Sequence, residues 1–119
     1  MNGIFDQISS PLILSSCTLR VEPASNEIVV SVAGELDMAD SDKVASVLVN
    51  AADSGKPLVR LELSGLTFAD SSAIKAIVLG AQAAARHDVA FELVNPNGRV
   101  QRLLEITGLA GAITIVRDD

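Results

Sequence analysis

Residues Val59 to Gly80, VRLELSGLTFADSSAIKAIVLG, carry the clearest structural pattern in the sequence. The first five of these residues alternate between apolar and charged, which is typical of a strand with one buried face. A glycine interrupts this pattern. Asp70-Ser71-Ser72 follow as residue types that favour a helix start, because a side-chain oxygen can accept hydrogen bonds from the free N–H groups of the first turn. The next apolar residues recur with helical spacing and form one stripe: Ile74, Ile77, Val78 and Ala81. The stretch therefore predicts a buried strand, a turn and a core helix, with two hydroxyls and a carboxylate presented outward where the helix begins.

Strands and helices alternate through the rest of the chain. The predicted elements are a hairpin over residues 17–21 and 27–33, a helix from Asp40, a strand over 89–94, a helix that begins at Asn95-Pro96 and a strand over 112–116. This order predicts an α/β fold. Its mixed β-sheet has an N-terminal hairpin and parallel strands joined by helical crossovers.

Length and composition are those of one domain. The chain has 119 residues, of which 49% are hydrophobic, and a chain of this size can bury roughly 65% of its unfolded surface. Residues 1–16 follow no clean period, so we predict that they form an N-terminal extension. Residues 17–119 are predicted to form the single domain.

Charge and aromatic content exclude some classes of partner. The formal net charge is −6, whereas nucleic-acid binding needs a basic stripe. With no Trp or Tyr and only three Phe, the chain also lacks platforms on which bases could stack. No uncharged run approaches the roughly 20 residues of a membrane helix, and the single Cys17 fits a reducing compartment. We therefore expect a cytoplasmic protein with no direct nucleic-acid binding and no membrane insertion.

Patterns for catalysis and metal binding are weak. Ser72 and Lys75 have the Ser-x-x-Lys spacing of serine acylases, but the Ser-Asp-Asn and Lys-Thr-Gly motifs of those enzymes are absent from the sequence. Asp37, Asp40 and Asp42 do not follow the ligand spacing of a calcium loop; they suit a helix N-terminus, where acids interact with the dipole. The only histidine is expected at the end of a helix. We therefore predict a binding protein, not an enzyme, with no catalytic residue, no metal and no cofactor.

Three segments, in this order, resemble the signatures of STAS-domain anti-sigma factor antagonists. They are GELD at 34–37, LTFADSS at 66–72 and RLLEITGL at 102–109. The likeness runs from about Cys17 to Val116, and the order and spacing of the segments are more specific than any one motif. The resemblance implies a STAS-like mixed sheet with helices packed mainly on one face. It also implies a small bacterial cytoplasmic regulator that is a monomer or a weak dimer.

The resemblance further implies a phosphorylation site. In that family the serine directly after the motif Asp is phosphorylated by a partner that is both serine kinase and anti-sigma factor. The unphosphorylated form binds the anti-sigma factor and frees the sigma factor, and a serine phosphatase resets the cycle. By position the phosphoacceptor is Ser71, with the adjacent Ser72 as the alternative. The residues expected at the partner-binding surface are Asp37, Asp70, Ser71, Ser72, Ala73 and Lys75.

One departure from the family pattern leaves a second function open. The family usually has Gly after the two hydroxyl residues, whereas this chain has Ala73, whose methyl group favours the helix by up to about 1 kcal/mol and can alter the recognition fit. The alternative is a STAS subunit of a lipid-transport ABC complex, which binds its ATPase without phosphorylation. Such subunits often have Asp-Thr-Ala-Gly at this place, so Ser71-Ser72-Ala73 is intermediate between the two classes.

Overall fold

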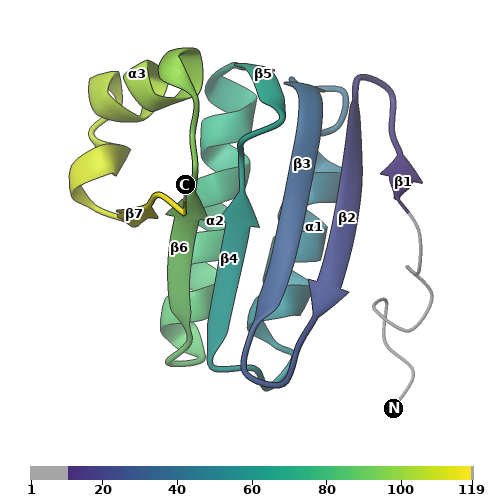
Figure 1. Ribbon diagram of the computed structural model, residues 1–119, viewed down its shortest axis with the longest axis vertical. Helices are drawn as coiled ribbons and strands as arrows, with labels where there is room; N and C mark the ends of the chain where they lie inside the picture. Colours follow the sequence, from purple (N-terminus) through teal and green to yellow (C-terminus); the bar gives the residue numbers. More distant parts are fainter. Residues whose placement is uncertain (1–10, 119) are drawn as a thin grey trace.

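The structure, a computed structural model, describes residues 11–118 and is built around one mixed β-sheet (Figure 1). In chain order the elements are β1 (Leu12–Ile13), β2 (Cys17–Pro23), β3 (Ile28–Leu36), α1 (Ser41–Ala52), β4 (Leu58–Glu62), β5 (Leu66–Ala69), α2 (Ser71–Arg86), β6 (Ala90–Val94), α3 (Gly98–Ile106), the 3-10 turn η2 (Leu109–Gly111) and β7 (Thr114–Val116). The strand order is β1-β2-β3-β4-β6-β7, and β5 pairs with the end of β3.

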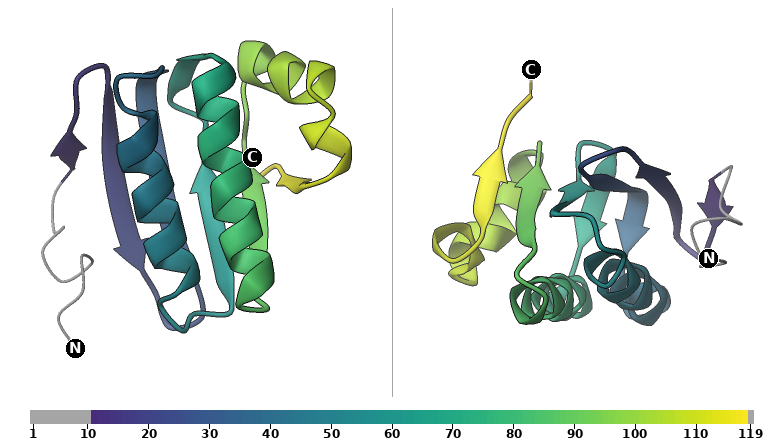
Figure 2. Two further views of the ribbon diagram at one scale, coloured as in Figure 1. Left: turned by 180° about the vertical axis from the view of Figure 1, so that it is seen from behind. Right: turned by 90° about the horizontal axis from the view of Figure 1, so that it is seen from below.

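The strand directions place the carboxyl ends of several strands at one edge of the sheet. β2 and β3 form an antiparallel hairpin, whereas β3, β4, β6 and β7 are parallel neighbours. The carboxyl ends of the parallel strands therefore meet at one edge, termed here the carboxyl edge, and α1 and α2 both begin there (Figure 1). Figure 2 shows α1 and α2 side by side on one face of the sheet. The predicted α/β fold with its hairpin, parallel strands and helices mainly on one face is confirmed.

The core is formed by the inner face of the sheet and the two long helices. The predicted alternation in β4 is confirmed, because Val59, Leu61 and the following Leu63 are at most 1% exposed. Of the predicted stripe of α2, Ile77 is buried, whereas Ile74, Val78 and Ala81 are half-buried. The residues that are buried in α2 are mainly small: Ala73, Ala76, Ile77, Gly80, Ala83 and Ala84.

Close packing of α1 against α2 explains this difference. A Cβ atom on Gly80 would lie 2.9 Å from Leu48 Cβ, so the two helices approach where α2 has no side chain. The larger Ile74 and Val78 are therefore displaced to the flanks of the contact and remain half-buried. Periodicity placed Ile74 and Val78 in the core, although the close approach of the helices requires small residues there.

Two predicted element boundaries were wrong. Residues 66–69, expected to be part of a turn, form the strand β5, of which only Leu66 is fully buried. The third helix begins at Gly98, not at Asn95-Pro96, because Asn95 has a φ of +54°, which a right-handed helix cannot accommodate. Asn97 is the cap, and its side-chain oxygen accepts a hydrogen bond from the N–H of Val100 at 3.2 Å.

The predicted N-terminal extension contributes to the sheet. Its described part contains β1, which pairs antiparallel with β2 through Leu12 opposite Leu19 and Ile13 opposite Thr18. The first ten residues of that extension lie outside the described residues. Within residues 11–118, none of the helices combines the length and the apolar character needed to cross a membrane.

Candidate functional site

Ser71 is the first residue of α2 and lies at the carboxyl edge of the sheet (Figure 1). β5 runs parallel to the end of β3 and brings the chain to this point. Ser71 is exposed, whereas Ser72 is half-buried. Of the two adjacent hydroxyls, that of Ser71 is therefore the more accessible to another protein.

Asp70 fixes the start of α2. It is the N-cap residue, and its Oδ1 accepts hydrogen bonds from the N–H groups of Ser72 at 2.9 Å and Ala73 at 3.2 Å. These contacts satisfy two of the free N–H groups of the first helical turn. The cap function expected for one member of the Asp70-Ser71-Ser72 triplet therefore belongs to the carboxylate, which leaves the Ser71 hydroxyl outside the helix.

A second segment, residues 37–40, meets the start of α2. Leu36 lies opposite Ala69 in the β3–β5 ladder, and the N–H of Asp70 donates to the carbonyl oxygen of Leu36 at 3.4 Å. Asp37, the next residue along, accepts a hydrogen bond at Oδ1 from the N–H of Ala39 at 3.0 Å. The pairing of β3 with β5 thus brings the partly exposed Asp37 to the same edge as Asp70, although 33 positions separate them in the sequence.

Lys75 and Ala73, the other two predicted surface residues, have opposite environments. Lys75 is exposed one helical turn after Ser71, on the same side of α2. Ala73 is 0% exposed and packs into the core. Its inclusion in the contact surface was therefore wrong, because the methyl group that replaces the usual glycine hydrogen lies inside the protein.

Two apolar residues of this edge were missed by the sequence analysis. Met38, in the turn after β3, is 79% exposed, and Phe68, on β5, is 40% exposed. Both adjoin residues that the motif singles out, since Met38 directly follows Asp37 and Phe68 precedes Asp70 by two positions. Their position beside these acids was the available signal, but no pattern in the sequence indicates that either side chain is exposed.

Asp40 is the N-cap residue at the predicted start of α1, but its side chain does not cap the helix. It makes no side-chain hydrogen bond to the helix and is only 2% exposed. Its two carboxylate oxygens accept hydrogen bonds from three successive backbone N–H groups: Ser15 at 3.0 Å, Ser16 at 2.7 Å and Cys17 at 3.2 Å. Asp40 thus fastens the N-terminal segment, with β1, to the turn that carries Asp37 and Met38.

Burial and hydrogen bonds act on Asp40 in opposite directions. Burial raises the pKa of this carboxyl, but the hydrogen bonds from Ser16, Ser15 and Cys17 outweigh that effect and hold the pKa below the ordinary value. For Cys17, burial and then the adjacent Asp40 carboxylate raise the pKa of the thiol to about 12. Asp40 is therefore charged and Cys17 neutral at physiological pH. Both side chains are buried and contribute to the fold, not to the exposed surface.

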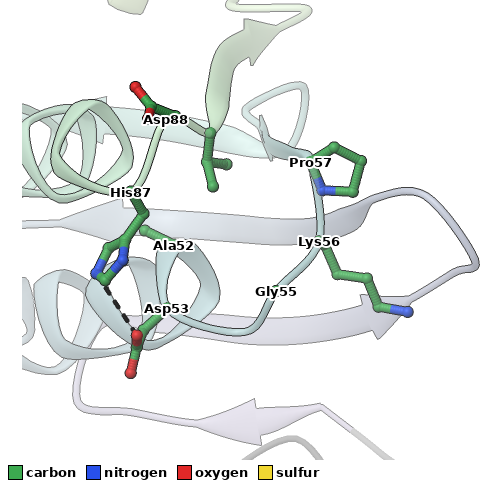
Figure 3. Close-up of a pocket in the computed structure, with 8 residues that line it drawn as sticks. Ala52, Asp53, Gly55, Lys56, Pro57, His87 and Asp88 are labelled. Atoms are coloured by element: carbon green, nitrogen blue, oxygen red, sulfur yellow. Dashed lines mark ion pairs between the residues drawn. The ribbon is translucent and has the colours of Figure 1, made fainter.

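The opposite end of the helices carries a mixed-charge hollow of about 450 Å³, shown in Figure 3. His87, the C-cap of α2, has its Nε2 3.5 Å from Oδ1 of Asp53, the C-cap of α1. The helix-end position expected for the histidine is confirmed. The 15 peptide units from Ser72 to His87 span about 22 Å of helix, so a Ser-His relay is not assembled. Within residues 11–118, no three His, Cys, Asp or Glu side chains are grouped to hold a metal ion.

Comparisons with known proteins agree with this geometry. Residues 19–117 match the family model described as "Mlab, STAS domain". The anti-sigma-B factor antagonist of Bacillus subtilis (strain 168) is 30% identical over 95 residues, which cover 80% of this chain and 86% of that protein.

Solved structures share the fold. An anti-sigma factor antagonist from Mycobacterium paratuberculosis has a TM-score of 0.76 and 24% identity over 85% of this chain and 86% of that one. The anti-sigma factor antagonist SpoIIAA has a TM-score of 0.75 in its unphosphorylated form, with 17% identity over 85% and 88% of the two chains. For the Bacillus SpoIIAA in its phosphorylated form the TM-score is 0.69, with 17% identity over 85% and 91%.

The seven-stranded mixed sheet with α1 and α2 on one face matches the STAS fold of these neighbours. This chain belongs to the STAS-domain family of anti-sigma factor antagonists.

Proposed function

We propose that this chain is an anti-sigma factor antagonist that works as a phosphorylation switch. When unphosphorylated, it binds a partner that is both anti-sigma factor and serine kinase, which frees the sigma factor for transcription. Phosphorylation of Ser71 releases that partner, and a serine phosphatase restores the binding form. The observation that best supports this proposal is the exposed Ser71 at the start of α2, within a segment that matches the family motif. The chain acts as a cytoplasmic binding protein, not as an enzyme.

The position of Ser71 suits a switch that acts in the interface and not in the fold. A phosphoserine carries roughly −1.5 to −2 charges at neutral pH, and negative charge near an exposed helix N-terminus is favourable by about 0.3–1 kcal/mol. Phosphorylation should therefore leave α2 intact. That SpoIIAA has been solved in both forms, each with the fold of this chain, supports this expectation.

The same charge is costly at a bound surface. A like-charge contact in an interface can cost several kcal/mol, and a hundredfold loss of affinity needs only about 2.8 kcal/mol. Asp70 and Asp37 already make this edge acidic. A partner that docks against Ser71 would therefore meet repulsion, added bulk and lost hydration once the serine is phosphorylated.

Mass spectrometry after incubation with ATP and each purified anti-sigma kinase of the host tests the proposal. We expect one phosphate on the wild-type chain, located on Ser71, and none on the Ser71→Ala variant. Ser72→Ala is the matched control and should be phosphorylated like the wild type. Phosphate that persists in Ser71→Ala and disappears in Ser72→Ala would reassign the acceptor, and no phosphate with any kinase would contradict the proposed function.

The alternative, a STAS subunit that binds the ATPase of a lipid-transport complex, requires no phosphate. The neighbouring genes separate the two functions: a sigma factor or serine kinase gene supports the first, and transporter genes support the second. The accessible Ser71 hydroxyl favours the phosphorylation switch.

A further inference from the structure

We propose that Met38 and Phe68 are the apolar anchors with which the carboxyl edge binds its partner, and that the partner offers an apolar pocket bordered by basic side chains. This inference rests on the proposed function, since the partner is the anti-sigma kinase that modifies Ser71. It adds the residues that supply affinity and the surface chemistry that the partner must have.

The β3–β5 pairing brings the two anchors to the same edge as the proposed phosphoacceptor segment. Phe68 lies opposite Glu35 and Ala69 lies opposite Leu36 in this ladder. Beyond that register, β3 continues into the turn with Met38, and β5 continues into α2 with Ser71. A protein that contacts the Ser71 hydroxyl closely enough to phosphorylate it therefore docks on the edge that carries both exposed apolar residues.

The residue types of these two exposed side chains suit a binding surface. Met38 keeps 79% of its surface in water and Phe68 keeps 40%, although both belong to the residue types that are enriched in interfaces. Burying an apolar side chain stabilises a complex in proportion to the area removed from water. Methionine also adapts to irregular pockets because its side chain is unbranched and flexible. These two side chains are therefore suited to act as anchors.

The carboxylate oxygens that make no hydrogen bond at this edge indicate the charge that the partner surface must carry. In Asp37 and Asp70 the hydrogen bonds described above use Oδ1, and among residues 11–118 Oδ2 of each accepts none. Glu35 is exposed next to them, and Lys75 is the positive residue of the adjoining turn of α2. Acidic groups around an apolar centre are complemented by arginine or lysine around an apolar pocket. The partner surface is therefore basic at its rim.

Two other exposed apolar residues provide matched controls. The exposed fraction of Ile106, 71%, is similar to that of Met38. The exposed fraction of Leu79, 38%, is similar to that of Phe68. Leu79 lies two helical turns into α2 from Ser71, and Ile106 is the last residue of α3, which begins beside the start of α2 and runs away from it (Figure 1). Neither belongs to the proposed surface.

Calorimetric titration of the kinase that phosphorylates Ser71 tests the anchors. ADP is present in place of ATP, so that no phosphoryl group can be transferred during the measurement. We expect Met38→Ala and Phe68→Ala each to weaken binding by about tenfold or more, the loss typical of an interface anchor, and Leu79→Ala and Ile106→Ala to stay within about twofold of wild type. With ATP, the KM for phosphorylation should rise by the same factor and kcat should not change, because neither side chain touches the reacting atoms.

Met38 is the decisive position, because its exposure leaves it with little role in folding. Phe68→Leu accompanies Phe68→Ala and keeps most of the apolar volume, so its affinity should lie between those of wild type and Phe68→Ala.

Affinity should also fall as salt is raised, since the basic rim acts through charge. Equal affinities for Met38→Ala and wild type, equal losses in all four alanine variants, or no salt dependence would overturn the proposal while phosphorylation of Ser71 stands. If no anti-sigma factor of the host binds the wild-type chain, the proposed function fails and the anchors fail with it.

Discussion

Asp70, Ser71 and Ser72 are consecutive, yet their side chains meet different surroundings. The Asp70 carboxylate holds the first N–H groups of α2, the Ser72 side chain is half-buried, and Ser71 is exposed. One helix start therefore provides both a rigid attachment and an accessible hydroxyl. The cap bonds fix Asp70 in place, whereas the exposure of Ser71 and Ser72 depends on the face of α2 on which each lies.

Removing the cap should destabilise the fold measurably. We expect Asp70→Ala to lower the free energy of unfolding by about 1 kcal/mol, within the 0.5–2 kcal/mol range of lost caps. Asp70→Asn, which keeps a side-chain acceptor, should lose less. Urea denaturation followed by circular dichroism measures both variants. An Asp70→Ala variant as stable as the wild type would contradict the capping role.

At the scale of elements, the contact between α1 and α2 depends on small residues. Alanine normally favours a helix over glycine by up to about 1 kcal/mol, but a methyl group on Gly80 would meet Leu48 Cβ at 2.9 Å. We therefore expect Gly80→Ala to destabilise the protein by about 1–3 kcal/mol, as overpacking does. Thermal unfolding measures the effect.

Gly98 offers the matched control for this substitution. It is also a helical glycine, in α3, but a methyl group there would meet no atom within 4 Å. Gly98→Ala should leave the melting temperature unchanged or slightly raised. If both variants behaved alike, the close approach of α1 and α2 at Gly80 would be wrong.

The second element contact is the one between Asp40 and the N-terminal segment. We expect Asp40→Asn to lower the free energy of unfolding by at least about 2 kcal/mol at neutral pH, because hydrogen bonds to a buried charge are lost or weakened. The folded pKa of Asp40 lies below the unfolded value of about 3.9. Its stabilising contribution is therefore complete above that unfolded value and is lost as pH falls through the folded pKa.

Urea denaturation from neutral to acidic pH tests this sign. The difference in stability between wild type and Asp40→Asn should be constant above about pH 5 and should shrink below about pH 4. Asp42→Asn is the control, since Asp42 is exposed in the first turn of the same helix. A difference that grew in acid would contradict the depressed pKa.

The elements differ in how well the sequence predicts them. β4 and the start of α2 were predictable because alternation, a glycine and a cap triplet follow one another in a single stretch. β5 was not, since a four-residue strand with one buried residue has no distinctive period. The role of Asp40 was also hidden, because its partners are backbone N–H groups 23 to 25 positions earlier, which no side-chain pattern reports.

At the scale of the whole molecule, one edge of the sheet gathers the features of a binding site. The motif residues Asp37, Asp70 and Ser71 come together there through the β3–β5 pairing, with Met38 and Phe68 beside them. The motifs indicated the first three, because the resemblance ties them to one function. The two apolar residues became visible only in the structure, since their exposure depends on the fold and not on local sequence.

Under the proposed function, a phosphate on the exposed Ser71 would change the surface and not the architecture. Far-ultraviolet circular dichroism of the chain before and after phosphorylation should therefore give the same helix content.

The most direct test of the phosphorylation switch is a comparison of two affinities for one anti-sigma kinase, measured with ADP present. One is that of the unphosphorylated chain, and the other is that of the chain phosphorylated on Ser71. We predict that phosphorylation weakens binding by about a hundredfold or more, which corresponds to about 2.8 kcal/mol. Equal affinities for the two forms would contradict it.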